Sequence, residues 1–450
     1  FKKIPEQEKN TFKKNSIGTD DKFVFLWNNR NARRKMSASV LWWFRDFLKE
    51  VGDDKACLIM HTDPADPYGA DLPQLLDACD ATDGQVLISS AKYPPNELAM
   101  IYNMADCTIN ISDAEGFGMA TSYTNIKPII EPFKNGIADI IIGEDPFRPE
   151  KLYDKIFKLT DTRKSNEKKW SREAIIRISS ALDIACWDLI GKSGKLPLYK
   201  LFGGFKNQVP CYVTCAYYRD GKDNNELKAE IEKLLAGGHK SFKGKVGGLS
   251  LKEDIKRMEV IRNVIGEDKD FMVDVNRAWD LKTAIEGAKA LEDLKPTWLE
   301  EPLRWEDDKR GLRELSKRTM IPLSGGESEL TSYGCRSMLE EQAIQILQFD
   351  CTMFGGFTHG KKLVSICELN HIDVAPHHDC YIHASLVAST SAGRFLESFP
   401  DPERDPLQAE LFENPHKIEE GILYLNNEPG LGLKLSDVAL KKYSKPVYNS

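Results

Sequence analysis

The sequence has no apolar run long enough to cross a membrane and no excess of basic residues. A membrane helix needs roughly 18–20 successive apolar residues, and no such run occurs. Lys and Arg number 62 against 69 Asp and Glu, a net charge of −7, which disfavours nucleic-acid binding through phosphate neutralisation. We therefore expect neither a membrane nor a nucleic acid as a partner.

Clustered cysteines are also missing. The nearest pair among the ten, Cys211 and Cys215, lacks the second pair that a structural zinc site needs. Buried thiols in a reducing compartment are the simplest interpretation, so we expect a cytoplasmic protein. The opening residues FKKIPEQEKN contain no apolar segment of a secretory signal and no initiator Met, which indicates a processed or truncated chain.

The length of 450 residues predicts more than one domain, and 41 % hydrophobic residues are ample for a core. Residues 1–120 alternate short apolar runs with a helical pattern at 37–50. This βαβ rhythm predicts a doubly wound, Rossmann-like α/β fragment. The strands are expected at 23–29, 56–62, 85–90 and 107–112.

A stronger alternation of strands and helices follows, and it predicts a (β/α)7β TIM-like barrel over residues 206–415. Residues 121–205 read as mostly helical, with Ser171 and Glu173 placed as a capping box, and 416–450 as a C-terminal segment returning to that cap. The eight barrel strands are expected at 209–216, 241–247, 271–276, 297–302, 321–327, 343–350, 372–378 and 394–399.

Three successive strands of this barrel end in an acidic residue: Asp274, Glu300 and Glu327. Barrel active sites lie at the C-terminal ends of the strands. One such carboxylate is ordinarily a polar cap, but three converging carboxylates suit Mg²⁺. Glu301 should point to the opposite face from Glu300, while Asn276 shares the face of Asp274 and is a candidate substrate contact.

Other strand ends carry candidate acid–base groups. Lys243 and Lys245 share one side of their strand, where mutual repulsion would lower an ammonium pKa; a solvated surface pair is the alternative. Asp350 would orient His377 and raise its basicity, although a structural histidine is equally compatible. Glu397 could remain protonated in a dry pocket and donate to an oxyanion.

From about Asn125 onward the chain resembles the enolase superfamily, in its mandelate racemase and muconate-lactonizing branch. The resemblance implies that Asp274, Glu300 and Glu327 bind Mg²⁺. It also implies that Lys245 and the His377–Asp350 pair act on opposite faces of the substrate, and that Lys243 and Glu397 stabilise the enolate. The motifs that carry it are SALDIACWDLIGKSGKLPLYKLFGG (180–204), KGK (243–245), VDVN (273–276), WLEEP (298–302), GGE (325–327), QFDCTMFGGFTHG (348–360), APHH (375–378) and FLES (395–398).

This family implies abstraction of the α-proton of a carboxylate substrate, with Mg²⁺ as cofactor. The segment FPDPERDPLQ (399–408) looks like that of acid-sugar dehydratases, so dehydration of a sugar acid to a 2-keto acid is expected. Racemisation, epimerisation or cycloisomerisation are the alternatives. The resemblance also implies a homo-oligomer, and only the final helical part of the family's capping domain is recognisable, at 126–157.

Residues 1–120 resemble part of the nucleotide-sugar-binding domain of GT-B glycosyltransferases, through WNNRNARRK (27–35), MHTDPADPYGADL (60–72), YNMADCTINIS (102–112) and DAEGFG (113–118). The resemblance implies that Arg30 and Lys35 contact a diphosphate and that Glu115 lies near a sugar. Tyr123 replaces the second Glu of that pattern, and the acceptor domain is missing, so sugar transfer is not expected. The joined halves indicate a natural fusion, a mis-assembled gene model or a chimeric sequence. The functional alternatives are a catalytically silent fusion, in which the barrel only scaffolds, and a sugar-nucleotide-binding module formed by residues 1–120.

Overall fold

The computed structural model describes residues 5–29, 31, 37–66, 69–91, 93–108, 127–402, 405 and 409–443. The chain divides into two compact units, Phe1–Gly116 and Phe117–Ser450, each with its own core. In the described part of the chain, no helix combines the length and the apolar character that a membrane crossing needs.

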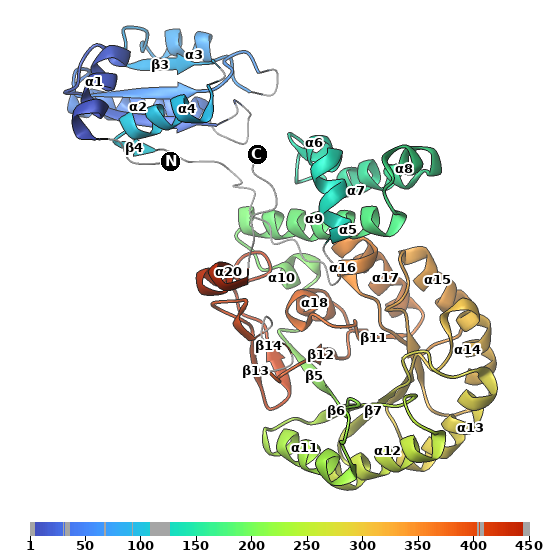
Figure 1. The fold of residues 1–450 in the computed structure, drawn as a ribbon. Coiled ribbons are helices and arrows are strands. Elements are labelled where there is room, and N and C mark those ends of the chain that lie inside the picture. Colours follow the sequence, from blue (N-terminus) through green and yellow to red (C-terminus); the bar gives the residue numbers. More distant parts are fainter. Residues whose placement is uncertain are drawn as a thin grey trace. The chain divides into compact units, whose positions relative to one another are not determined.

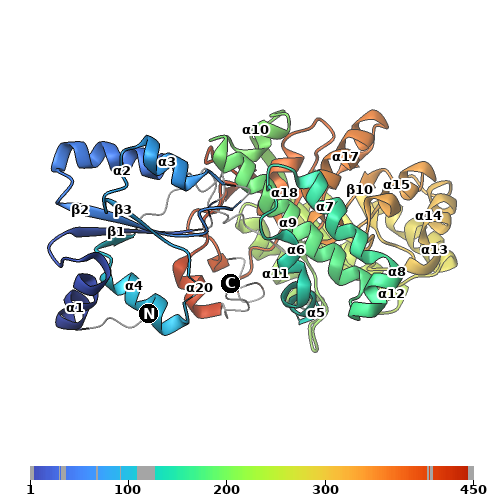
Figure 2. The same cartoon turned by 90° about the horizontal axis from the view of Figure 1, so that it is seen from above.

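The N-terminal unit is a four-stranded sheet in the order β3-β2-β1-β4, with every pair parallel. Helices α2 and α3 cover one face and α1 and α4 the other (Figure 2). This arrangement is the predicted doubly wound fragment. The elements are α1 Glu6–Ile17, β1 Phe23–Asn28, α2 Ser37–Val51, β2 Ala56–His61, α3 Leu72–Ala78, β3 Val86–Ser89, α4 Pro95–Met104 and β4 Cys107–Thr108.

Alternation along β1 explains why this sheet is covered on both faces. Val24 and Leu26 pack with residues of α1 and α4, whereas Trp27 packs with those of α2 and α3. Successive side chains of a strand point to opposite faces, so a continuous apolar run fits a strand that is buried on both sides.

The second unit is built around a closed barrel of eight parallel strands, β5 to β12 (Figure 1). Strand β12 pairs with β5, and Val374 of β11 bridges to Gly393 just before β12, which closes the ring. All eight predicted strands are present. They are β5 Gln208–Cys215, β6 Ser241–Lys245, β7 Asp270–Asp274, β8 Trp298–Glu300, β9 Leu323–Gly325, β10 Ile346–Leu347, β11 Asp373–Val374 and β12 Leu396–Ser398.

Helices surround the barrel, as Figure 1 shows. Their apolar faces and the outward-facing strand residues form the largest core of the molecule. The helices are α11 Asn224–Ala236, α12 Leu251–Ile265, α13 Leu281–Leu291, α14 Asp308–Ser316, α15 Ser332–Glu340, α16 Cys351–Phe354, α17 Gly356–Leu369 and α18 Cys380–Val387.

Residues 127–202 form a helical layer against the barrel, and the C-terminal segment returns to it. Leu198 donates its backbone N–H to Gly430 at 2.8 Å, and Leu431 donates to the carboxylate of Asp188 at 2.8 Å. The elements are α5 Lys127–Pro132, α6 Ala138–Ile141, α7 Pro149–Phe157, α8 Thr162–Lys168, α9 Arg172–Ser193, α10 Leu198–Phe202, β13 Lys417–Glu419, β14 Ile422–Tyr424 and α20 Asp437–Tyr443.

The predicted capping box of α9 is wrong in one detail. Ser171 is the N-cap and accepts a hydrogen bond from the backbone N–H of Ala174. Glu173 stands one position too early to close the box, and its carboxylate instead binds Arg177 one turn along, at 2.8 Å.

Candidate active site

The barrel's interior places its charged side chains at the C-terminal strand ends, above an apolar floor. Tyr212, Met272, Trp298, Ile346, Ala375 and Phe395 make that floor. Above it, Lys243, Asp274, Glu300 and Glu397 are each at most 2 % exposed. Charges buried this deeply are tolerated only when they are paired or hold a cation.

Lys243 is the central cation of this cluster. Its Nζ lies 2.6 Å from Glu300 Oε1, 2.9 Å from Glu397 Oε1 and 3.6 Å from Asp274 Oδ2. Burial alone would lower the pKa of the ammonium, but the attraction of Glu300 and Glu397 raises it well above its ordinary value. The expectation that repulsion between the two lysines lowers this pKa is therefore wrong for Lys243, because the carboxylates outweigh the second ammonium.

Lys245, two residues further along β6, points into the same site. Its Nζ donates to Asp274 Oδ2 at 2.5 Å and to Asn276 Oδ1 at 2.9 Å. Asn276 thus lies on the face of Asp274, as predicted, and has φ +47°. The side chain of Lys245 remains 14 % exposed, so its amine stands at the open side of the cluster, where a substrate can reach it.

Glu300 has one carboxylate oxygen held in place and the other directed at the charge cluster. Its Oε2 accepts from Trp298 Nε1 at 2.9 Å and from Gln348 Nε2 at 2.7 Å. Burial, reinforced by repulsion from Asp274, raises the pKa of Glu300 to about 8. Its burial therefore makes the ionised form of Glu300 costly unless a cation lies beside it.

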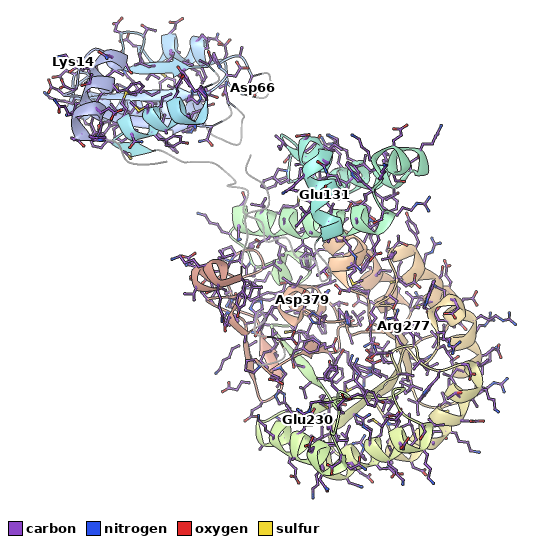
Figure 3. All side chains as sticks on the ribbon, in the orientation of Figure 1. Lys14, Asp66, Glu131, Glu230, Arg277 and Asp379 are labelled. Atoms are coloured by element: carbon purple, nitrogen blue, oxygen red, sulfur yellow. The ribbon has the colours of Figure 1, made fainter. Side chains whose placement is uncertain are left out.

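Glu301 makes a network of its own, separate from the partners of Glu300. Its Oε1 accepts from the hydroxyl of Ser328 at 2.7 Å, and its Oε2 lies 3.1 Å from Arg277 Nε. Arg277 is labelled in Figure 3, where it lies in the barrel unit. This network ties the end of β8 to the residue that follows Glu327.

His377 follows β11, which lies three strands away from β6 around the ring. Its Nδ1 lies 3.3 Å from Asp350 Oδ2, and its Nε2 lies 3.8 Å from Glu327 Oε2. Burial acts to lower the pKa of His377, but the neighbouring Glu327 and Asp350 carboxylates raise it to about 10. The predicted pair is thus formed, and the imidazole is a protonated acid near neutral pH.

Glu397 is ionised, contrary to the sequence-based expectation of a protonated carboxyl. The carboxyl is buried, which acts to raise its pKa, but Lys243 and other positive groups lower the pKa well below its ordinary value. Oε1 also accepts from Thr214 at 2.5 Å, and Oε2 accepts from the backbone N–H of His378 at 2.8 Å. An ionised Glu397 has no proton to donate to an oxyanion. Its carboxylate instead forms an ion pair with Lys243.

Four residues of the site escaped the sequence analysis because their roles depend on neighbouring strands. These are Thr214, Trp298, Gln348 and His383. His383 is fully buried; it accepts from the backbone N–H of Cys351 and lies 3.6 Å from Asp350 Oδ1. Position was the only signal in the sequence for two of them. Trp298 precedes Glu300 by two residues and Gln348 precedes Asp350 by two, a spacing that places both members of a pair on the same face of a strand.

The donor set suits a hard divalent cation. Asp274, Glu300 and Glu327 supply only oxygen ligands, as Mg²⁺ prefers. Within the described residues, no group of three or more potential ligands has the spacing of a metal site; Glu300 and Asp274 are instead paired with Lys243 and Lys245. The chemistry of the residues fits the ion.

The remaining candidates lie outside the described residues. Arg30, Lys35 and Glu115, for which contacts with a nucleotide sugar are predicted, all fall there.

The closed (β/α) barrel carries two lysines in its second strand, acids at or just after the ends of the next three strands, and a His–Asp pair beyond them. This arrangement suits an enzyme that abstracts a proton. Family models agree: "Mandelate racemase / muconate lactonizing enzyme, N-terminal domain" matches residues 105–203 and "Enolase C-terminal domain-like" matches 226–439. The chain belongs to the enolase superfamily, in its mandelate racemase and muconate-lactonizing family. The predicted enzyme class is confirmed.

Named relatives and a solved structure agree with this assignment. A 3,6-anhydro-alpha-L-galactonate cycloisomerase of Streptomyces coelicolor is 32 % identical over 57 % of this chain and 69 % of its own. An arabinonate dehydratase of Saccharolobus solfataricus is 28 % identical over 81 % of this chain and 95 % of its own length. The L-talarate dehydratase of a Polaromonas species was solved with Mg and L-glucarate. It is 28 % identical to this chain, with a TM-score of 0.65, and the match covers 74 % of this chain and 89 % of the dehydratase. Magnesium, the predicted cofactor, is bound in that relative's structure.

Proposed function

We propose that this protein dehydrates a sugar acid to a 2-keto-3-deoxy acid. The observation that carries the proposal is the placement of an amine and a protonated imidazole, Lys245 and His377, around one cluster of buried carboxylates. Arabinonate and talarate dehydratases among the relatives support this choice of reaction.

In this mechanism Lys245 takes the proton from C2 of the substrate, and the electron pair of that bond moves into the carboxylate to give an enediolate. Lys243 neutralises the developing charge, and Glu397 keeps Lys243 in place. When bound by Asp274, Glu300 and Glu327, Mg²⁺ supplies Lewis-acid polarisation of the substrate carboxylate.

His377 then completes the elimination. The electron pair returns to form the C2–C3 double bond while the C3–O bond breaks, and the imidazolium donates its proton so that the hydroxyl leaves as water. The resulting enol tautomerises to the 2-keto acid. The hydrogen bond to Asp350 holds the imidazole for this transfer.

A screen of sugar acids with Mg²⁺, read out by 2-keto acid formation, tests the proposal. We expect turnover that EDTA abolishes and added Mg²⁺ restores. Turnover that is insensitive to EDTA, or none at all in a folded sample, would contradict it.

Epimerisation or cycloisomerisation is the second candidate, because the same two groups could deliver a proton to either face and cycloisomerases occur among the relatives. Proton NMR of the product separates the three reactions. Dehydration gives a 2-keto acid, epimerisation a diastereomer of the substrate, and cycloisomerisation an isomer without loss of water.

For the N-terminal unit, nucleotide-sugar binding remains a separate proposal, supported by its parallel sheet of order β3-β2-β1-β4. Titration calorimetry with UDP- and GDP-sugars tests this proposal. The absence of any binding heat at millimolar ligand would contradict it. Assembly into a homo-oligomer is likewise a proposal, and sedimentation velocity measures it directly.

A further inference from the structure

Tyr217 and Tyr218 follow β5 after a single residue, Ala216, and their side chains point to opposite sides. Tyr218 turns outward, where its hydroxyl donates to Asp254 at 2.5 Å and its ring lies 4.1 Å from the guanidinium of Arg257. Tyr217 turns inward, and its ring centroid lies 5.7 Å from Lys245 Nζ. Only one of the two aromatic rings therefore borders the amine that takes the substrate proton.

The backbone that aims Tyr217 is strained. Ala216, between β5 and Tyr217, has φ +58°, a left-handed conformation that costs a residue with a Cβ free energy of order 1–3 kcal/mol. Such strain persists only where the surroundings enforce it, and it gathers at functional sites.

Charged side chains from three places enforce this conformation. Glu230 of α11 accepts the backbone N–H of Ala216 at 2.9 Å, and Arg257 of α12 donates to its carbonyl at 2.6 Å. Lys222 donates to the carbonyl of Tyr217 at 3.1 Å. Figure 3 places Glu230 on the α11 side of the barrel. The turn is thus fixed before any ligand arrives, which is how a binding surface is pre-organised.

We infer that Tyr217 is a specificity-determining residue that forms the wall of the reaction centre on the Lys245 side and contacts the hydroxylated chain of the acid. A partly buried aromatic ring presents an apolar face to the C–H bonds of a polyol and a polar edge to its hydroxyls. Contacts beyond the reacting carbons discriminate between acids of different length. This inference rests on the proposed function.

The test compares acids that differ in chain length. The ratio of kcat/KM between a five-carbon and a six-carbon aldonate is independent of the fraction of enzyme that folds. In Tyr217→Leu we expect that ratio to change at least tenfold, with KM rising more than kcat falls. Tyr217→Phe keeps the ring and should change the ratio less than threefold.

Tyr218→Phe is the control, because it removes the hydroxyl of the neighbouring ring, which faces Asp254 and away from Lys245; its ratio should stay within twofold of wild type. An unchanged ratio in Tyr217→Leu, with an active wild type, overturns the inference alone. Wild-type protein that turns over no acid overturns the proposed function and this inference with it. An equal change in Tyr218→Phe also overturns the inference, because the effect would then belong to the whole turn.

Discussion

Asp183 of α9 accepts the backbone N–H of Thr358, near the start of α17, at 2.9 Å and also binds its hydroxyl. Trp187, one turn along α9, donates its indole N–H to the same hydroxyl at 2.9 Å. A residue of the helical layer thus caps a barrel helix 175 positions later in the chain. The layer and the barrel are joined through this buried group.

The buried position of Asp183 predicts a pH-dependent stability. Burial raises its pKa from 3.8 to about 7, so the folded state holds a proton that the unfolded state releases. Stability from this group is complete below the unfolded pKa and is lost as the pH rises toward 7, at up to about 1.4 kcal/mol per pH unit. We expect Asp183→Asn to show a shallower fall in the free energy of unfolding over this range, measured by urea denaturation. Parallel curves for the two proteins would contradict the assignment.

The two general acid–base groups should act on separate faces of the substrate. Lys245→Ala should slow exchange of the α-proton with D₂O on one face by about 10²-fold or more, and His377→Asn should do so on the other face, as followed by NMR. Lys252→Ala, at an exposed position of α12, is the control and should exchange normally. If both site variants exchange at the wild-type rate, the assigned roles are wrong.

Gln348 should control magnesium affinity without touching the ion. Its amide donates to Glu300 Oε2 and so orients the proposed ligand carboxylate, and loss of such a supporting bond typically costs roughly 10- to 100-fold in metal affinity. We expect Gln348→Leu to weaken Mg²⁺ binding by about that factor in titration calorimetry. Unchanged affinity would show that Trp298 alone suffices to orient the carboxylate.

The separate cores predict separate responses to cavity mutations. Leu58→Ala, in the core of the N-terminal unit, should cost about 2–5 kcal/mol of that unit's stability and leave dehydration intact. Leu299→Ala, in the barrel core, should instead lower the temperature at which activity is lost. Leu249→Ala, at a half-exposed site, is the control. Calorimetric transitions that shift together for both variants would contradict independent cores.

Much of the site could be predicted because barrel geometry converts strand order into spatial order. Each acid at the end of a strand must lie at the same rim, so Asp274 and Glu300 could be placed together without coordinates. Thr214 and Gln348 could not be found in this way, because their partners lie on neighbouring strands and sequence spacing carries no record of that pairing.

The sequence by itself determined the parallel strands of both units, the succession of the barrel strands and the residue types at their ends, because hydrophobic period and turn chemistry act locally. Only the tertiary structure decided the charge states: Glu397 ionised beside Lys243 and His377 protonated beside Glu327 and Asp350. A pKa depends on burial and on charges a few ångströms away, and these distances exist only once the strands have closed into a ring.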